Sequence, residues 1–291
     1  MESILDKVTE KYIRREPFTH VVFKNALPTE LADRLLREYP SPYYLGKGRQ
    51  GLARDGKLPN NIKIRYDSKD ILNDDKLSPF LKEFVSRHLT FDFFKQYMAL
   101  LGEDIYRLHP KLREYLKNIK PEDVGIRNID TYKTKKVLIE AELCVDTPVS
   151  KASSVRGIHL DNAHKIGVAL LYLRDPSNNS VGGDFEVYKR KNSSNYIVNH
   201  ISNIKERYLK NFEKVASFPY EHNTLLMFLN TDRAFHGVSN RAPTDQLRQV
   251  FDIAIELPFP LFDISAHREN FIIKKLRALY LKITGINKEL V

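Results

Sequence analysis

The sequence contains a single cysteine, no internal repeat and no apolar run long enough to cross a bilayer. One cysteine excludes an intramolecular disulfide and a cysteine-rich zinc site. Because Cys144 stands in the strand-like segment LIEAELCVDTP, we expect it to be buried and inert. The first residues also lack the apolar segment of a secretory signal. We therefore expect a cytoplasmic protein without a membrane span.

The charge of the chain favours anionic partners. Its 291 residues include 47 Lys and Arg against 37 Asp and Glu, a net charge of +10. Such a surface attracts small carboxylated or phosphorylated molecules, and also nucleic acid. No stripe of basic residues interleaved with exposed aromatics is evident, so nucleic acid is the less favoured partner. The sequence does not indicate an oligomeric state.

The first half of the chain is expected to be rich in helix. We interpret residues 1–291 as one domain, in which residues 1–135 pack on a sheet. The patterns in this part predict an amphipathic helix at 1–15, a strand at 19–27, a helix starting at Pro28 and Thr29, an exposed loop at 41–61, and further helices from SPFLKEFVSRHL onward.

From residue 136 the pattern changes to short strands. Six segments rich in β-branched and aromatic residues are bounded by Pro, Gly, Asn and Asp: KVLIEAELCV, KIGVALLYL, GGDFEVYK, EKVASFPY, NTLLMFL and LRQVFDIAIE. This series predicts a sandwich or barrel at 136–256, with double-sheet jelly rolls among the candidates. A basic helical insert is expected at 201–212, and a tail at 257–291 with a basic amphipathic helix at 268–285.

The stretch RGIHLDNAHKIGVALLYL holds the best candidate for a reactive site. Residues two apart on a strand project from the same face, so His159 and Asp161 can offer one nitrogen and one oxygen to a metal. The third ligand would be His236, in LLMFLNTDRAFHGVS. Two histidines and one carboxylate form the facial triad of non-haem Fe(II) oxygen chemistry. An isolated H-x-D pair is more often an ordinary surface pair, so the surrounding motifs matter.

A buried arginine downstream is the second candidate. Arg248 in LRQVFDIAI stands near the start of a predicted strand. Guanidinium recognises a carboxylate through two parallel hydrogen bonds, so this residue could anchor the far end of a dicarboxylate co-substrate whose other end reaches the metal. The alternative is an internal ion pair or a place at the solvated edge of the sheet.

Taken in order, H-x-D, the Gly-Gly strand, NTLLMFLNTDRAFHGVS and the downstream Arg resemble the Fe(II)/2-oxoglutarate-dependent oxygenase superfamily, in its prolyl 4-hydroxylase-like branch. The resemblance covers about residues 136–256. It implies a double-stranded β-helix in which His159, Asp161 and His236 hold iron and Arg248 pairs with 2-oxoglutarate. It further implies use of O2, with ascorbate as an accessory reductant, conversion of 2-oxoglutarate to succinate, and hydroxylation of the substrate.

One position departs from the family pattern, which often has a hydroxyl residue two places after the basic one. Here that place is Val250, so the second partner of the carboxylate would be Tyr172 or Ser239. Arg156 could hold an anionic substrate at the mouth of the site or be a surface charge. Asn162 could orient the ligand carboxylate and the substrate or serve a turn.

The leading hypothesis is thus a hydroxylase of a small anionic substrate. Two alternatives stay open. One is an oxidative demethylase of nucleic acid from the same superfamily, and the other is a non-catalytic jelly-roll binding module.

Overall fold

The computed structural model describes residues 1–46, 57–191 and 206–262. Before residue 137 it contains short 3-10 turns at Glu10–Tyr12 and Pro121–Asp123. The other elements of this part are β1 (Ile13–Arg14), β2 (His20–Lys24), α1 (Thr29–Arg37), α2 (Pro42–Leu45), β3 (Lys63–Tyr66), α3 (Ser68–Asn73), α4 (Pro79–Arg87), α5 (Phe91–Leu108), α6 (Lys111–Leu116) and β4 (Val124–Ile126).

The second half is built of strands, as predicted. They are β5 (Val137–Asp146), β6 (Lys165–Tyr172), β7 (Phe185–Arg190), β8 (Phe212–Phe218), β9 (Thr224–Leu229), β10 (His236–Val238) and β11 (Arg248–Glu256), with a 3-10 turn at Glu206–Asn211 before β8. No helix in the described ranges is both long and apolar enough to span a membrane.

The strands form two sheets. The large sheet has the order β1-β2-β9-β6-β11-β5-β3, with β4 parallel to β5, and the small sheet has the order β10-β7-β8. A bridge between His159 and His236 adds a further segment beside β10. From β5 to β11 the chain passes repeatedly between the two sheets, and neighbouring strands are antiparallel. This order is that of a double-stranded β-helix, so the predicted jelly roll is confirmed.

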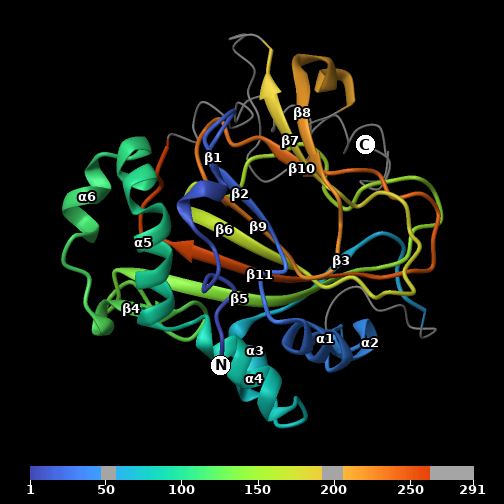
Figure 1. Cartoon of the computed structure of the whole chain (residues 1–291), viewed down its shortest axis with the longest axis horizontal. Helices are drawn as coiled ribbons and strands as arrows, with labels where there is room; N and C mark the ends of the chain where they lie inside the picture. The colour runs from blue at the N-terminus through green and yellow to red at the C-terminus, as the bar shows by residue number, and fades with distance from the viewer. Residues whose placement is uncertain (47–56, 192–205, 263–291) are drawn as a thin grey trace, which may run out of the picture.

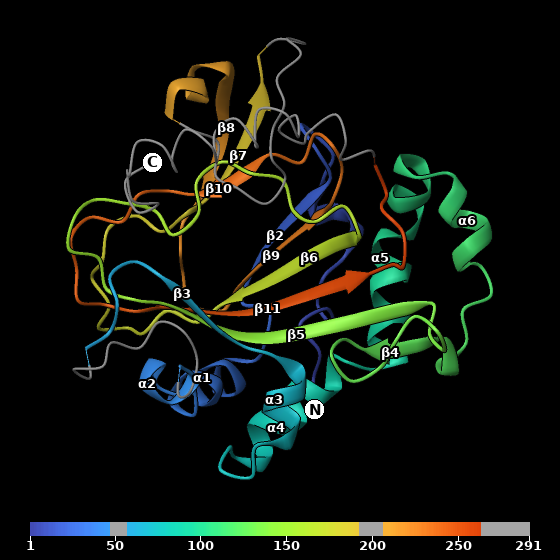
Figure 2. The ribbon, with the colours of Figure 1, turned by 180° about the vertical axis from the view of Figure 1, so that it is seen from behind.

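Alternation along the strands explains the layers. In β5 the apolar residues Val137, Ile139, Ala141, Leu143 and Val145 belong to the main core with side chains of α4 and α5. The opposite face of β5 carries Glu140, Glu142, Cys144 and Asp146 toward the small sheet. In Figures 1 and 2, α1 to α4 lie on one side of the large sheet, and β7, β8 and β10 lie on the other. The space between the sheets is therefore the polar interior where a site can form.

The Gly-Gly turn before β7 is required by its backbone. Gly182 and Gly183 have φ of +85° and +82°, which L side chains rarely adopt. A Cβ atom on Gly182 would lie 2.0 Å from the carbonyl oxygen of Asn240. The two glycines thus let the segment before β7 lie close to the segment that follows β10.

The predicted helix at 1–15 is wrong. This segment forms turns, a 3-10 turn and β1, which pairs with β2. Ile4 and Leu5 are buried in the main core, and the N–H of Ile4 donates to the ring of His88. Contacts with α4 hold this segment in place, so it does not form the helical hydrogen bonds that its apolar spacing suggested. The predicted loop at 41–61 begins with the short helix α2, while its residues 47–56 lie outside the described residues.

Two further predictions concern residues that the structure does not describe. They are the helix at 268–285 in the tail and residues 201–205 of the basic insert. The division of the chain into one domain with a helical tail stays a prediction.

Candidate metal centre

His159 and His236 lie side by side on antiparallel segments between the sheets. Their backbones exchange two hydrogen bonds, of 2.9 and 3.1 Å, and their ring centroids are 4.2 Å apart. Oδ1 of Asp161 lies 3.5 Å from Nε2 of His159 and 3.9 Å from Nε2 of His236. All three side chains are buried. Strand pairing therefore joins the H-x-D pair to a histidine 75 residues beyond Asp161, as the spacing predicted.

The hydrogen bonds of the two rings fix their tautomers. Nδ1 of His159 lies 2.8 Å from the carbonyl oxygen of Gly157, and Nδ1 of His236 lies 2.8 Å from that of Ala234. A carbonyl can only accept, so each Nδ1 carries the proton and each Nε2 presents a lone pair. Two lone pairs and a carboxylate oxygen then converge without a proton donor between them. This donor set fits a metal ion, and the carbonyl groups orient the rings as metal-site partners commonly do.

The protonation states of the three side chains also fit metal binding. Burial lowers the pKa of His236 to about 3, and burial and the nearby Arg156 lower the pKa of His159, so both rings are neutral at pH 7. Burial alone would raise the pKa of Asp161. The Lys165 ammonium and the Arg156 guanidinium favour the charged form more strongly, and the pKa lies well below its usual value. The three groups are thus deprotonated at their ligand atoms before any metal arrives.

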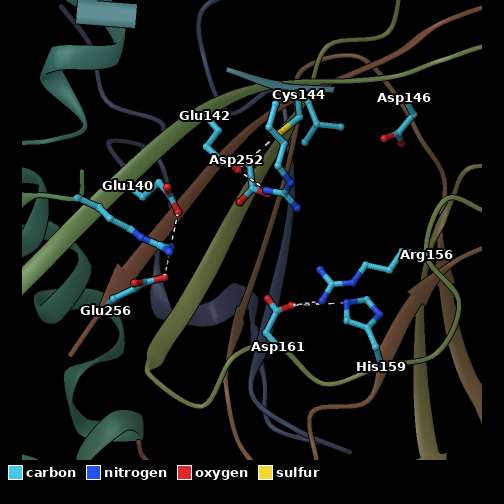
Figure 3. A network of polar contacts seen from close by, with 12 residues as sticks. Glu140, Glu142, Cys144, Asp146, Arg156, His159, Asp161, Asp252 and Glu256 are labelled. Carbon is cyan, nitrogen blue, oxygen red and sulfur yellow. Dashed lines mark hydrogen bonds and ion pairs between the residues drawn. The ribbon is translucent and has the colours of Figure 1, made fainter. Parts of the chain in front are cut away.

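A small cavity, partly open to solvent, surrounds the three ligands. One wall is apolar, and Phe185 and Phe228 pack on the ring of His236 at 5.4 and 4.3 Å between centroids. Arg156 lies at the site, as one of its two interpretations proposed, with a terminal nitrogen 3.3 Å from Oδ1 of Asp161. Figure 3 shows Arg156 directly beside Asp161 and His159. The cavity therefore presents the ligand set to a small molecule.

Arg248 lines the same cavity but is also part of an internal ion pair. One terminal nitrogen donates to Asp146 at 2.8 Å, and Nε donates to the carbonyl oxygen of Gly183 at 2.8 Å. The guanidinium lies between the rings of Tyr172 and Tyr220, 4.7 and 5.1 Å from their centroids. The internal ion pair of the second interpretation is thus present and fixes the guanidinium beside Tyr172, while the role of Arg248 toward a co-substrate stays a prediction.

The two proposed partners of a co-substrate carboxylate differ in their environment. Tyr172 lines the cavity, and its buried hydroxyl makes no hydrogen bond of normal geometry with any described residue. Ser239 is not among the residues that line the cavity. Its hydroxyl accepts the backbone N–H of Asp184 at 3.0 Å. The structure brings Tyr172, and not Ser239, to the cavity with Arg248.

Asn162 also lies outside the cavity lining. Its side-chain oxygen accepts the N–H of His164, and its carbonyl accepts from the side chain of Asn230 at 2.7 Å. These contacts are those of a turn, the alternative interpretation of this residue.

Three residues of the cavity lining were not predicted from the sequence, namely Lys63, Arg65 and Lys165, which lie there with Asp252. Tyr172 faces the cavity, and Lys165 lies seven residues before it on β6. Strict alternation would therefore place Lys165 on the opposite face of the strand. The irregular pairing of β6 with β11 between Ile255 and Glu256 turns Lys165 inward. Gly167 at this bulge is a local signal of the irregularity, since a glycine inside a strand often marks a bulge, but it does not indicate which way Lys165 turns.

A second group of potential ligands lies next to the cavity. Glu142, Cys144 and Asp252 offer ligand atoms within 4.8 Å of one another. The Arg65 guanidinium pairs with both carboxylates and already supplies their positive charge. Burial raises the pKa of the Cys144 thiol well above its usual value, so this cysteine is buried and inert, as expected.

Neither a protein-family model nor a curated protein matches the sequence. Among solved structures, the chain is similar to a prolyl-4-hydroxylase from Pseudomonas putida, with 12% identity, a TM-score of 0.42, and coverage of 82% of this chain and 93% of the other. A prolyl 4-hydroxylase from Phytophthora capsici gives 12% identity, a TM-score of 0.45, and coverage of 96% and 71%. The dioxygenase for auxin oxidation in rice gives 13%, 0.41, and 91% and 86%. These are likenesses of fold at low identity, and the strand order of the chain itself establishes its double-stranded β-helix.

Proposed function

We propose that this protein is an Fe(II)- and 2-oxoglutarate-dependent dioxygenase of the prolyl 4-hydroxylase-like branch, and that it hydroxylates a small anionic substrate. The observation that carries the proposal is the convergence of two neutral imidazole nitrogens and one carboxylate oxygen in a buried cavity. Two histidines and one carboxylate are the ligands that non-haem Fe(II) oxygenases use, and they leave the other coordination positions open.

His159, Asp161 and His236 would hold the metal. When bound, a ferrous ion with 2-oxoglutarate and O2 supplies the oxidant that inserts oxygen into a C–H bond, while 2-oxoglutarate becomes succinate and CO2. The chain's own contribution is to orient the ligands through the carbonyl groups of Gly157 and Ala234. The apolar wall with Phe185 and Phe228 keeps water away from the reacting atoms.

The co-substrate would lie between the metal and Arg248. Its distal carboxylate would accept hydrogen bonds from the remaining terminal nitrogen of Arg248 and from the Tyr172 hydroxyl. The support is the Tyr172 hydroxyl, which is buried beside Arg248 and forms no hydrogen bond of normal geometry with a described residue. A carboxylate of the co-substrate would give this buried donor a well-aligned acceptor. Ser239 could take part only by leaving its bond to Asp184.

The substrate would enter near Arg156, whose guanidinium lines the cavity beside Asp161. We propose an anionic substrate because the cavity lining holds five cations, namely Lys63, Arg65, Arg156, Lys165 and Arg248, and two carboxylates, Asp161 and Asp252. A role for Asn162 in substrate binding would require it to leave its turn contacts. The use of ascorbate, the cytoplasmic location and the absence of nucleic-acid partners stay predictions.

The alternative of a non-catalytic module with structural zinc has less support. Structural zinc takes four protein ligands, and within the described ranges no fourth His, Cys, Asp or Glu joins the triad. The demethylase alternative has no observation in its favour beyond the net charge.

Anaerobic addition of Fe(II) and 2-oxoglutarate tests the proposal. We expect a metal-to-ligand charge-transfer band in the parent protein and none in His236→Ala. Arg248→Ala should keep the band but require roughly 10- to 100-fold more 2-oxoglutarate, because a charge-assisted hydrogen bond contributes about 1.5–3 kcal/mol. Absence of the band in the folded parent protein would refute the assignment.

A further inference from the structure

The metal centre lies between the two ends of the inner face of the large sheet. Lys165 and Tyr172 are the first and last residues of β6, so they lie roughly 20 Å apart at about 3.3 Å per residue. Tyr172 contacts Arg248 at one end. The ring of His236 packs on Phe228, which pairs with Val168 in the middle of β6. A co-substrate at the Arg248 end therefore leaves the Lys165 end of the cavity for the substrate.

At that end, a cation lies above a buried carboxylate. The Arg156 side chain is 30% exposed and lies over Asp161, which is 7% exposed. Figure 3 shows Arg156 and Asp161 together, apart from Glu142 and Asp252, which lie by Cys144. Asp161 orients the guanidinium from below, so the atoms that Arg156 offers to a ligand are N–H donors.

Lys165 completes this end of the cavity. Its ammonium lines the cavity and forms no hydrogen bond or ion pair with a described residue. Burial would lower its pKa, but Asp161, Asp252 and Glu256 lie near enough to raise it, and the group stays charged. Lys63 on β3 also lines the cavity, but it is the register partner of Asp146 and so lies at the Arg248 end. Arg156 and Lys165 are therefore the cations of the end opposite Arg248.

We propose that Arg156 and Lys165 bind an oxyanion of the substrate, a carboxylate or a phosphate, on the side of the metal centre opposite Arg248. The proposal deepens the function proposed above and depends on it. Because Arg156 contacts a metal ligand directly, an anion bound to Arg156 lies close to the metal. The oxidised carbon should therefore be only a few bonds from the anionic group of the substrate.

Thermal unfolding of the metal-free protein with inorganic phosphate or acetate tests this site, with sodium chloride at equal ionic strength as the reference. A ligand that binds the folded state raises the unfolding midpoint. We expect at least one of the two anions to stabilise the parent protein, and the more effective one identifies the chemistry. Lys165→Gln should weaken its apparent affinity by roughly tenfold. Lys95→Gln, which removes an exposed lysine of α5, should respond as the parent does.

Arg248→Gln shows which end of the cavity binds the anion, and it should keep the response. If this variant does not fold, the parent protein loaded with Mn(II) and excess 2-oxoglutarate, which fills the Arg248 end, replaces it. No response of the parent to either anion would overturn the proposal. So would a response lost in Arg248→Gln and kept in Lys165→Gln. Failure of the proposed function would appear separately, as a missing charge-transfer band in a protein that still binds the anion.

Discussion

Arg248 donates a hydrogen bond of 2.8 Å to Asp146, and both side chains are almost completely buried. The ion pair joins the start of β11 to the end of β5, where the two residues are register partners. The guanidinium that would anchor 2-oxoglutarate is therefore held in place and already paired with a carboxylate. A co-substrate would have to share this positive charge with Asp146.

Replacing Asp146 by Asn should destabilise the ligand-free protein and strengthen co-substrate binding. Removal of one partner of a buried ion pair costs about 3–5 kcal/mol, and the amide, which still accepts a hydrogen bond, should keep the loss at about 3 kcal/mol. The 2-oxoglutarate carboxylate would then supply the missing negative charge, so its dissociation constant should fall. Chemical denaturation and 2-oxoglutarate titration with Mn(II) measure the two effects.

The control for this variant is Asp75→Asn, because Asp75 is fully exposed and lies 3.9 Å from Lys82. Asp75→Asn should change neither the free energy of unfolding nor the dissociation constant of 2-oxoglutarate. Weaker 2-oxoglutarate binding in Asp146→Asn would mean that Asp146 serves to orient Arg248 and does not compete with the co-substrate.

Tyr172→Phe should weaken 2-oxoglutarate binding by about 3- to 10-fold and leave metal affinity unchanged, because one neutral hydrogen bond contributes about 0.5–1.5 kcal/mol. Ser239→Ala is the matched comparison, since its hydroxyl is already bound to the N–H of Asp184. We expect Ser239→Ala to lower thermal stability slightly and to bind 2-oxoglutarate as the parent does. If a 2-oxoglutarate titration showed weaker binding for Ser239→Ala than for Tyr172→Phe, Ser239 would be the partner of the carboxylate.

His88 should make the protein less stable in acid. Its buried ring accepts the N–H of Ile4 at 3.1 Å and donates to the carbonyl oxygen of Phe84 at 2.7 Å, and burial lowers its pKa to about 4. An unfolded histidine has a pKa near 6.5, so the unfolded state binds the extra proton as pH falls from about 6.5 to 4. The contribution of His88 is therefore complete above pH 6.5 and decreases by about 3 kcal/mol down to pH 4.

Denaturation of the parent and of His88→Gln between pH 7.5 and 4.5 measures this effect. The advantage of the parent over the variant should shrink as pH falls. A difference that is constant over this range would show that His88 does not titrate in this way.

Several features of the site were predictable from the sequence because they depend on local periodicity. The two-residue spacing of His159 and Asp161 gives them one direction on an extended segment. The change from helical to strand patterns at residue 136 indicated a sandwich or barrel, which the family resemblance narrowed to a jelly roll. The glycines before β7 marked a turn that only glycine adopts easily. The order of these motifs then indicated His236 as the third ligand.

Other features depended on contacts that no local pattern encodes. Asp146 and Arg248 stand 102 residues apart, and only the pairing of β5 with β11 brings them together. The bulge in the pairing of β6 with β11 turns Lys165 into the cavity against strict alternation.

By itself, the sequence determined which residue types recur at strand spacing, and hence the fold and the three convergent ligands. The tertiary structure decided which of the remaining polar groups are available to a ligand. The side chains of Ser239 and Asn162 already accept hydrogen bonds from backbone N–H groups. The buried hydroxyl of Tyr172 has no such backbone partner in the described ranges. The physical reason is that the direction of a side chain follows from the local backbone, whereas the satisfaction of its hydrogen bonds depends on every segment packed around it.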